Sequence, residues 1–466
     1  MISKNTRLEH DLLGEREVSQ NHYYGIHTVR AMENFPITGM SIQKYPALIE
    51  GLAFVKEACA KANFELGFLD SARFQAIQKA CIEIRSGKLR EEFVVDVIQG
   101  GAGTSTNMNA NEVIVNRALE ILGFSRGNYK ELHPLEHVNL SQSTNDVYPT
   151  AVKVALHYEI DYLISAMEIL RKDFELKSVE FSEILKMGRT QLQDAVPMTL
   201  GQEFSTYAVM LQEDQQRLRE AALLIQEINL GATAIGTGIN APENYAPLAC
   251  KALSDLTGIQ FSTADNLVEA TQDAGAFVQL SGVLKRVAVK LSKVCNDLRL
   301  LSSGPRAGLG EINLPPVQAG SSIMPGKVNP VIPEVVNQIA FQVIGNDVTV
   351  TFAAEAGQLQ LNAFEPVIAH NLLTSLILLR QGCLTLAERC VRGITPNPER
   401  LRSYVNHSIG IITALNPLIG YENASMVAKE AYASGRSVTE LVVEKKLLTQ
   451  AQLDEILRPE NLIKPR

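Results

Sequence analysis

The segment from Gly320 to Pro330 has the residue types that a site for a small anion needs. It reads Gly-Ser-Ser-Ile-Met-Pro-Gly-Lys-Val-Asn-Pro. Its glycines and prolines predict a strained backbone with outward-facing N–H groups, which together with a lysine can hold carboxylates. The two serines, Ser321 and Ser322, can donate to an anion, or one of them can act as a base if its hydroxyl is deprotonated. The alternative is a flexible surface loop with a solvated lysine, and composition alone gives the two readings equal weight.

This segment lies inside a longer connection that is unusually rich in glycine and proline. Eleven of the thirty residues from 304 to 333 are Gly or Pro, and strong helical patterns flank them on both sides. Long loops without secondary structure are uncommon in compact domains and are usually functional or disordered. Because this loop carries few charges and several apolar residues, we expect it to be ordered over a site.

Four segments, in the expected order, resemble the site regions of the aspartase/fumarase superfamily. The first is the loop above, and the others are GAGTSTNMN (101–109), SQSTND (141–146) and GRTQLQDA (188–195). The resemblance continues through GATAIGTG (231–238) and LNPLIG (415–420) and so covers nearly the whole chain. Members of this superfamily eliminate an amine or water to give fumarate. The resemblance therefore implies a carbon–nitrogen or carbon–oxygen lyase.

Within the superfamily the chain is most similar to the aspartases, over residues 187–204 and 296–315. Fumarases typically carry a histidine where this chain has Gln191, and they pair it with a glutamate that corresponds to Glu334. An amide cannot transfer a proton as an imidazole can, although it still forms hydrogen bonds. We therefore expect Glu334 to be a structural carboxylate in the first turn of a helix, where acidic residues are favoured. Fumarate hydratase and a crystallin-like structural protein remain the alternatives.

The resemblance also implies a role for each site residue. Ser321 corresponds to the general base, acting as an alkoxide that removes a proton from Cβ of L-aspartate. Four hydroxyls donate to the carboxylate that becomes an enediolate, three groups hold the α-carboxylate, and two amides face the amino group. The four hydroxyls are those of Thr104, Ser143, Thr144 and Ser322. The groups for the α-carboxylate are Lys327, Asn329 and Thr190, and the two amides are Asn145 and Gln191. The pairing of individual donors with a given carboxylate stays open.

Long helical patterns fill the middle of the chain and would position these residues. The clearest apolar series runs Leu280, Leu284, Val287, Leu291, Val294, Leu298, Leu301, with spacings of 4 and 3 that define a heptad seam. Similar patterns predict helices from about Pro149 to Glu180, over 200–228, from Glu334 to about Phe352, and from about Ala363 to Val391. No period-2 alternation is apparent between Pro149 and Arg392. These patterns predict an all-α, mainly helical protein with a long-helix bundle at its centre.

The chain is expected to form three domains, and its sites are expected to lie between subunits. We place an N-terminal domain at 1–141, the bundle at 142–396 and a small C-terminal domain at 397–466. A helix of roughly thirty residues is about 45 Å long, and SQSTND and GRTQLQ lie at its opposite ends. Both cannot surround one small dicarboxylate in a single rigid subunit. The resemblance implies a homotetramer, with a multi-helix core and sites built from three chains.

Composition narrows the remaining possibilities. With 43 Lys+Arg and 51 Asp+Glu the net charge is −8, which argues against a nucleic-acid partner. Six scattered cysteines without a CxxC pair indicate a reducing cytoplasm, and the charged N-terminus is not a signal peptide. The apolar stretch 372–379 is interrupted by polar residues and is expected to be far too short for a membrane span. No metal ligands or cofactor motif are recognised; activation by Mg²⁺, as in some aspartases, is left open.

Overall fold

The computed structural model describes residues 5–463, and the chain divides into two compact units. One unit contains the residues up to Ile164, together with Gln216–Arg286 and Phe341–Leu379. The other contains Ser165–Gln215, Val287–Ala340 and the residues from Arg380 onward. The division into domains at 1–141, 142–396 and 397–466 stays a prediction.

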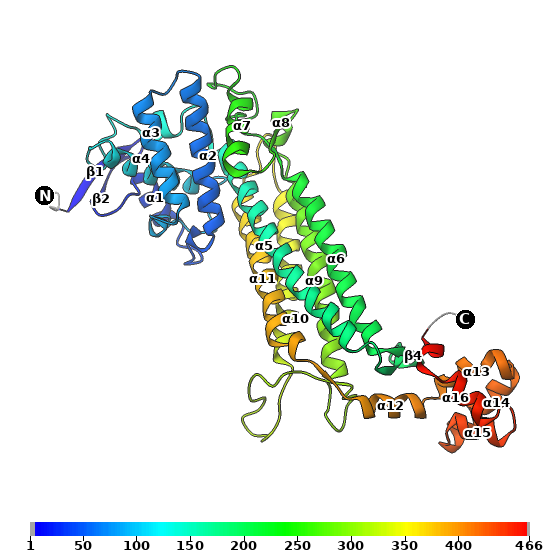
Figure 1. Ribbon diagram of the computed structural model, residues 1–466. Helices are drawn as coiled ribbons and strands as arrows, with labels where there is room; N and C mark the ends of the chain where they lie inside the picture. Colours follow the sequence, from blue (N-terminus) through cyan, green and yellow to red (C-terminus); the bar gives the residue numbers. More distant parts are fainter. Residues whose placement is uncertain (1–4, 464–466) are drawn as a thin grey trace. The chain divides into compact units, whose positions relative to one another are not determined.

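Five long helices contribute a part to each unit, which confirms the predicted helical centre. They are α5 (Thr144–Glu180), α6 (Leu200–Leu224), α9 (Gly275–Leu301), α10 (Val331–Glu355) and α11 (Glu365–Arg389) (Figure 1). All seven positions of the heptad series on α9 are buried. The third predicted helix is shorter than expected, because α6 ends at Leu224 and residues 227–228 form a strand.

Polar contacts join the long helices inside each unit. In the first unit, Ser281 of α9 donates to Asp347 of α10 (2.8 Å), and Asn346 of α10 donates to Ser375 of α11 (3.0 Å). In the second unit, the Asn337 amide of α10 donates to Ser292 of α9 (2.9 Å). These groups are buried, and buried polar groups stabilise a fold only when they are hydrogen-bonded. Together with the apolar seams, they fix which faces of the helices meet.

Shorter helices complete the first unit around the start of α5. They are α1 (Ile26–Asn34), α2 (Pro46–Glu65), α3 (Ser71–Arg85), α4 (Thr104–Ile121), α7 (Tyr245–Thr257) and α8 (Leu267–Ala270). Helix α2 packs against α3 and α7, and α3 packs against α4 (Figure 1). A short π-helix, Pro134–Val138, precedes α5.

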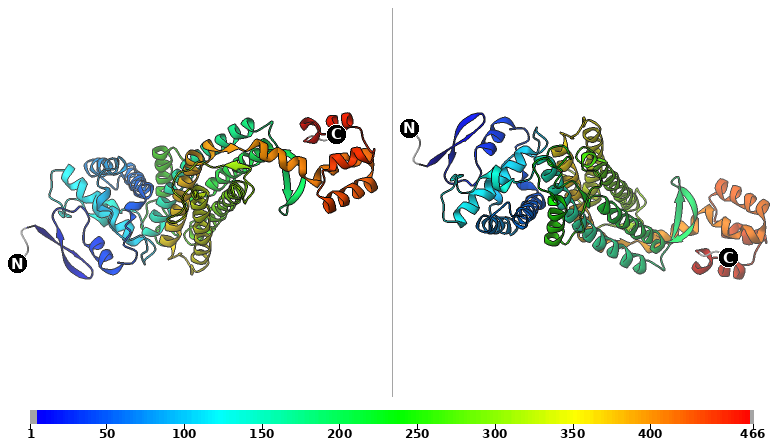
Figure 2. Two further views of the ribbon diagram at one scale, coloured as in Figure 1. Left: turned by 90° about the horizontal axis from the view of Figure 1, so that it is seen from below. Right: turned by 90° about the horizontal axis from the view of Figure 1, so that it is seen from above.

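Within residues 5–463, four two-stranded sheets interrupt the helices, and three of them place strands in 149–392, where no period-2 alternation was apparent. They are β1 (Thr6–Asp11) with β2 (Gly14–Ser19), β3 (Leu185–Thr190) with β4 (Gln193–Thr199), β5 (Glu227–Ile228) with β6 (Ser262–Thr263), and β7 (Ile312–Asn313) with β8 (Thr395–Pro396). Of the strand pairs in the described part of the chain, β5–β6 is parallel and the other three are antiparallel. Figure 2 shows β3 and β4 side by side, in green. Strand β3 gave no alternation signal because Lys186, Met187 and Gly188 are consecutively buried and a bulge follows.

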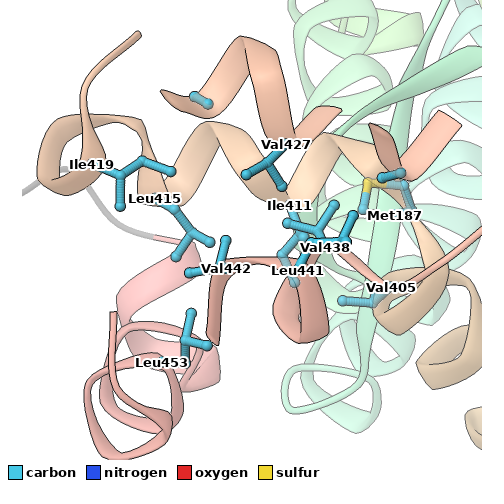
Figure 3. Packing of buried hydrophobic residues seen from close by; sticks show 12 residues of the cluster. Met187, Val405, Ile411, Leu415, Ile419, Val427, Val438, Leu441, Val442 and Leu453 are labelled. Atoms are coloured by element: carbon cyan, nitrogen blue, oxygen red, sulfur yellow. The ribbon is translucent and has the colours of Figure 1, made fainter. Parts of the chain in front are cut away.

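The C-terminal part of the second unit is a cluster of short helices with its own apolar core. The helices are α12 (Pro398–His407), α13 (Ile412–Ile419), α14 (Tyr421–Ser434), α15 (Val438–Glu444), α16 (Gln450–Ile456) and α17 (Pro459–Leu462). Their core includes Leu415, Val427 and Leu441, each fully buried (Figure 3). Met187 of β3 is part of the same core, so the β3–β4 hairpin is packed against these helices.

One helical stretch, Glu365–Gly393, is long and apolar enough to cross a membrane by length and composition alone. This stretch extends on both sides of 372–379, the apolar segment that was expected to be too short for a membrane span. In the structure, 56% of its most apolar window is buried inside the protein. Core helices of soluble proteins have the same composition, so the finding is weak evidence for a membrane span.

Candidate active site

Three of the predicted site residues, Thr104, Ser143 and Thr144, line one cavity in the first unit. The cavity has a volume of about 490 Å³. Thr104 begins α4, and Thr144 begins α5, where its Oγ1 accepts a hydrogen bond from the Asn107 amide (3.1 Å). Ser143 Oγ accepts from the Asn145 N–H (3.2 Å), which leaves the Ser143 hydroxyl hydrogen as a donor. Two helix N-termini and three hydroxyls therefore meet at this cavity, an arrangement that favours an anion. The Thr104 hydroxyl donates to the Gly101 carbonyl (2.7 Å), so only Ser143 and Thr144 keep a hydroxyl hydrogen for such an anion.

The N-terminus of α5 is fixed by contacts with residues 229–233. Asp146 is fully buried and accepts backbone N–H bonds from Ser143, Gly231 and Thr233, each at 3.0 Å. Burial raises the pKa of Asp146 to about 6, and the three N–H donors limit that rise. Proline at 149 has no N–H for the Asn145 carbonyl, and the Asn229 side chain donates to that carbonyl instead (3.0 Å). This substitute donor explains why the helix begins five residues earlier than expected.

Asn145 is held beside the cavity rather than in it. Its Nδ2 donates to the Ala234 carbonyl (2.7 Å), and its side chain does not line the cavity. The remaining amide oxygen, Oδ1, is an acceptor. Asn145 can therefore accept from an ammonium group, while one of the two hydrogens on its Nδ2 is already engaged with the protein.

A buried cation lies behind this cavity. Lys56 is fully buried, and its Nζ donates to Asn139 Oδ1 (2.9 Å) and Gln142 Oε1 (2.8 Å), two residues that line the cavity. Burial lowers the pKa of Lys56 to about 8, although nearby Asp146 acts in the opposite direction. The sequence patterns did not indicate Lys56, because it lies far along the chain from the motifs. Its ammonium contacts Asn139 and Gln142, which line the cavity, rather than the cavity itself.

Thr190 and Gln191 lie at the tip of the β3–β4 hairpin in the second unit, and both are exposed. Gln191 and Leu192 form the two-residue turn with φ angles of 54° and 63°. Turns of this kind usually contain asparagine or glycine, because larger residues are strained at positive φ. Such strain concentrates at functional sites. Turn propensity therefore does not explain a glutamine at position 191. The expected role of Gln191 rests on its side chain instead.

The loop that contains Ser321 is closed by its own hydrogen bonds. The Gly320 N–H donates to the Lys327 carbonyl (2.7 Å), and the Asn329 side chain donates to the Gly320 carbonyl (2.8 Å). A Cβ atom at position 320 would lie 2.6 Å from that Lys327 oxygen, so only glycine fits there. Asn329, which we expected to bind substrate, is half-buried and has this structural bond.

Ser321 directly follows Gly320 at the start of this closed loop and is half-buried. Its Oγ accepts backbone N–H bonds from Ile323 (3.2 Å) and Met324 (3.0 Å). We expected the amides of the loop to face outward, but these two face the serine, because the chain turns around its side chain. Donors aimed at a hydroxyl oxygen stabilise its negatively charged form. The geometry therefore supplies one of the two expected means of activating Ser321.

The other predicted groups of this loop are at the surface. Ser322 and Lys327 are exposed, and within residues 5–463 no carboxylate pairs with Lys327. An exposed lysine without an acidic partner can bind an anion without first breaking an ion pair. Glu334 lies in the first turn of α10, as predicted, and its N–H bonds the Pro330 carbonyl. The second unit thus holds Thr190, Gln191, Ser321, Ser322, Lys327 and Asn329, and the first unit holds the others.

The cavity has further lining residues that the sequence reading did not name. His27, Asn107, Asn139, Gln142 and Thr233 all line it, and Asn107 Oδ1 is buried without a hydrogen-bond partner. Asn107 and Gln142 lie within two of the motifs recognised in the sequence, so the motifs contained a signal for them. His27 had no such signal.

The family comparisons place this helical fold among the lyases. A family model described as "Lyase" matches residues 14–345, and one described as "Fumarase C C-terminus" matches residues 411–464. The chain belongs to the aspartase/fumarase superfamily.

Individual relatives cover nearly the entire chain. Aspartate ammonia-lyase from Helicobacter pylori (strain ATCC 700392 / 26695) is 57% identical over 98% of each chain, and that from Escherichia coli (strain K12) is 55% identical over 100% of this chain and 97% of its own. Among solved structures, fumarate lyase:delta crystallin from Brucella melitensis bound to cobalt has a TM-score of 0.96 at 56% identity, covering 99% and 100%. Recombinant class II fumarase from Schistosoma mansoni has a TM-score of 0.95 at 36% identity, with the same coverage.

Proposed function

We propose that this protein is an aspartate ammonia-lyase, which converts L-aspartate reversibly into fumarate and ammonia without oxidation. The structural observation that carries the proposal is the pair of backbone N–H groups bonded to Ser321 Oγ. The choice of amine over water is supported by identity, which is 55–57% to the two aspartate ammonia-lyases and 36% to the class II fumarase.

The reaction begins at Cβ, beside the β-carboxylate. The Ser321 alkoxide takes the Cβ proton, and the electron pair of the broken C–H bond moves into the carboxylate to form a doubly charged enediolate. The pair then returns to form the Cα–Cβ double bond while the C–N bond breaks, and its electrons leave with ammonia. The proton on Ser321 passes to solvent, which restores the base. No electrons are gained or lost, so the step needs no redox cofactor.

The hydroxyls provide stabilisation where negative charge develops. Ser143 and Thr144 line the cavity of about 490 Å³ and, with Ser322, donate to the enediolate. Thr104 lines the same cavity and joins them when its hydroxyl turns away from the Gly101 carbonyl. Donors held in place before the reaction are usually the largest electrostatic contribution of this kind. Lys327, with Thr190 and Asn329, binds the α-carboxylate. The oxygens of Asn145 and Gln191 accept from the ammonium group.

These groups come from different subunits in our proposal, which is a homotetramer with shared sites. Helix α5 has 37 residues and is about 55 Å long, with Thr144 at its start and the β3–β4 hairpin just after its end. A second support is an exposed apolar row on α10: Phe341, Val348 and Phe352 are 63%, 51% and 69% exposed, at spacings of seven and four. Such a row on a long helix fits a second helix of another copy.

We propose a cytoplasmic location and no required metal. All six cysteines are buried as free thiols, which suits a reducing compartment. Between residues 5 and 463 there is no group of three His, Cys, Asp or Glu side chains that could hold a metal ion, and activation by Mg²⁺, as in some aspartases, stays open.

Ultraviolet absorbance of fumarate tests the proposed activity directly. The purified protein is incubated separately with L-aspartate and with L-malate. We expect fumarate from aspartate and none from malate. Release from malate alone would indicate fumarate hydratase, and no release from either would indicate the structural-protein alternative.

A further inference from the structure

A buried carboxylate, Glu311, connects the two site-bearing segments of the second unit. It lies between Gly304 and Pro330, ten residues before Ser321, and its side chain is fully buried. Arg189 Nη1 donates to Oε1 (2.5 Å), and Lys186 Nζ is 2.9 Å from Oε2. The Lys186 contact is an ion pair without hydrogen-bond geometry, so Oε2 is satisfied by charge alone. Lys186 also pairs with Glu203.

Both cations come from the hairpin that presents the amide expected to bind the amino group. Lys186 and Arg189 lie on β3, and Arg189 immediately precedes Thr190 at the tip. In the part of the chain that is described, no hydrogen bond joins the tip directly to residues 320–329. The hairpin is instead joined to the connection that leads into this loop, because Arg189 and Lys186 both reach Glu311, ten residues before Ser321.

The backbone around Glu311 is equally constrained. Its N–H donates to the Leu301 carbonyl (2.8 Å), and its carbonyl accepts from the Asn397 N–H (2.9 Å). Arg400 of α12 donates to the carbonyls of Pro305 (2.8 Å) and Gly308 (2.5 Å). The backbone of Glu311 is therefore hydrogen-bonded to the end of α9 and to the start of α12. We expect its carboxylate to keep its position if the hairpin is displaced.

We propose that Glu311 is a positioning residue that fastens the β3–β4 hairpin to the base of the Ser321 loop, so that the two segments keep their geometry together. The inference rests on the proposed function for its kinetic consequence only. Removing the charge of Glu311 leaves Arg189 without its carboxylate partner and Lys186 paired with Glu203 alone, which is destabilising locally. A displacement of about 1 Å in a catalytic group can reduce a rate about 100-fold.

Hydrogen exchange of the full-length protein, followed by mass spectrometry, tests the connection without any assay of activity. In Glu311→Gln, amides in both 185–199 and 301–313 should exchange at least about tenfold faster than in the wild type. Asp214→Asn is the matched control, because Asp214 is 1% exposed on α6 and pairs with Lys290 (3.1 Å) away from both segments. Faster exchange in only one segment, or the same change in Asp214→Asn, would overturn the proposal.

Kinetics supply the second readout, in a double-mutant cycle with Arg189→Gln. Arg189 is 15% exposed and its removal leaves Glu311 paired with Lys186, so this variant tests the connection even if Glu311→Gln does not fold. We expect each single variant to lower kcat about 10- to 100-fold, and the double variant to lose no more than the worse single variant. If the losses in kcat of the two single variants multiply in the double variant, the shared role is refuted. A wild-type protein inactive on aspartate would refute the proposed function, while the exchange result would still decide the connection.

Discussion

Replacement of Ser321 by alanine should separate catalysis from binding. The two backbone N–H groups on Oγ, at 3.2 and 3.0 Å, stabilise an alkoxide more than a hydroxyl. Hydrogen bonds to a charged group contribute about 1.5–3 kcal/mol each, so the pair contributes about 3–6 kcal/mol. The corresponding rate factor is about 10²–10⁴, the range typical of a lost general base. We therefore expect kcat of Ser321→Ala to fall by at least 100-fold.

Binding should survive the same substitution, because Ser321 is not expected to hold either carboxylate. Titration calorimetry with L-aspartate should give a Kd for Ser321→Ala within about threefold of the Kd of the wild-type protein. Fumarate absorbance gives kcat. Ser434→Ala, at the exposed end of α14, controls for handling of the variants. More than a few per cent of wild-type kcat in Ser321→Ala would refute its role as the base. A parallel loss of binding would instead show that the two N–H bonds serve only the shape of the loop.

Three further predictions concern assembly and stability. Mixing inactive Thr144→Ala and Gln191→Ala tetramers should restore part of the activity once subunits exchange, and no recovery after confirmed exchange would count against shared sites. Burial raises the pKa of Glu365 from 4.5 to about 8, so the stability of the wild type should fall as the pH rises from 4.5 to 8. Glu365→Gln should therefore have a higher Tm than the wild type near pH 9 and no higher Tm near pH 5. Equal Tm values of the two proteins at both pH values would refute this prediction. Asp146→Asn should lower the free energy of unfolding in urea by about 2–4 kcal/mol, because it loses at least one buried backbone N–H bond; a change below about 0.5 kcal/mol would contradict this.

The long helices were predictable because their apolar residues face one side continuously. The β1–β2 hairpin was not predictable in this way, since its alternation is inverted. Arg7 and Glu9 of β1 are buried and paired at 2.7 Å, whereas Leu8 between them is 47% exposed. Arg7 also donates to the backbone carbonyls of Ser19 and Tyr24. A pattern of hydrophobicity cannot reveal a strand whose buried side is charged.

The site was predictable to the extent that its residues lie within short motifs. Ser321 and its N–H donors are within three residues of one another, so the loop sequence contained both. Glu311 and Arg189, in contrast, are 122 positions apart, and nothing in either segment indicates the other. Contacts of this kind depend on the tertiary fold, which local spacing does not encode.

An acidic protein can bind a dianion because local groups outweigh its net charge. Two unit charges 4 Å apart interact by about 4 kcal/mol at the effective dielectric constant of a protein surface, which is the contribution available from Lys327. Each hydrogen bond to a carboxylate adds about 1.5–3 kcal/mol. The net charge of −8 is spread over a surface much larger than the screening length of about 8 Å at physiological salt. Substrate affinity should therefore fall sharply in Lys327→Met but change little when exposed acidic residues such as Glu444 are neutralised.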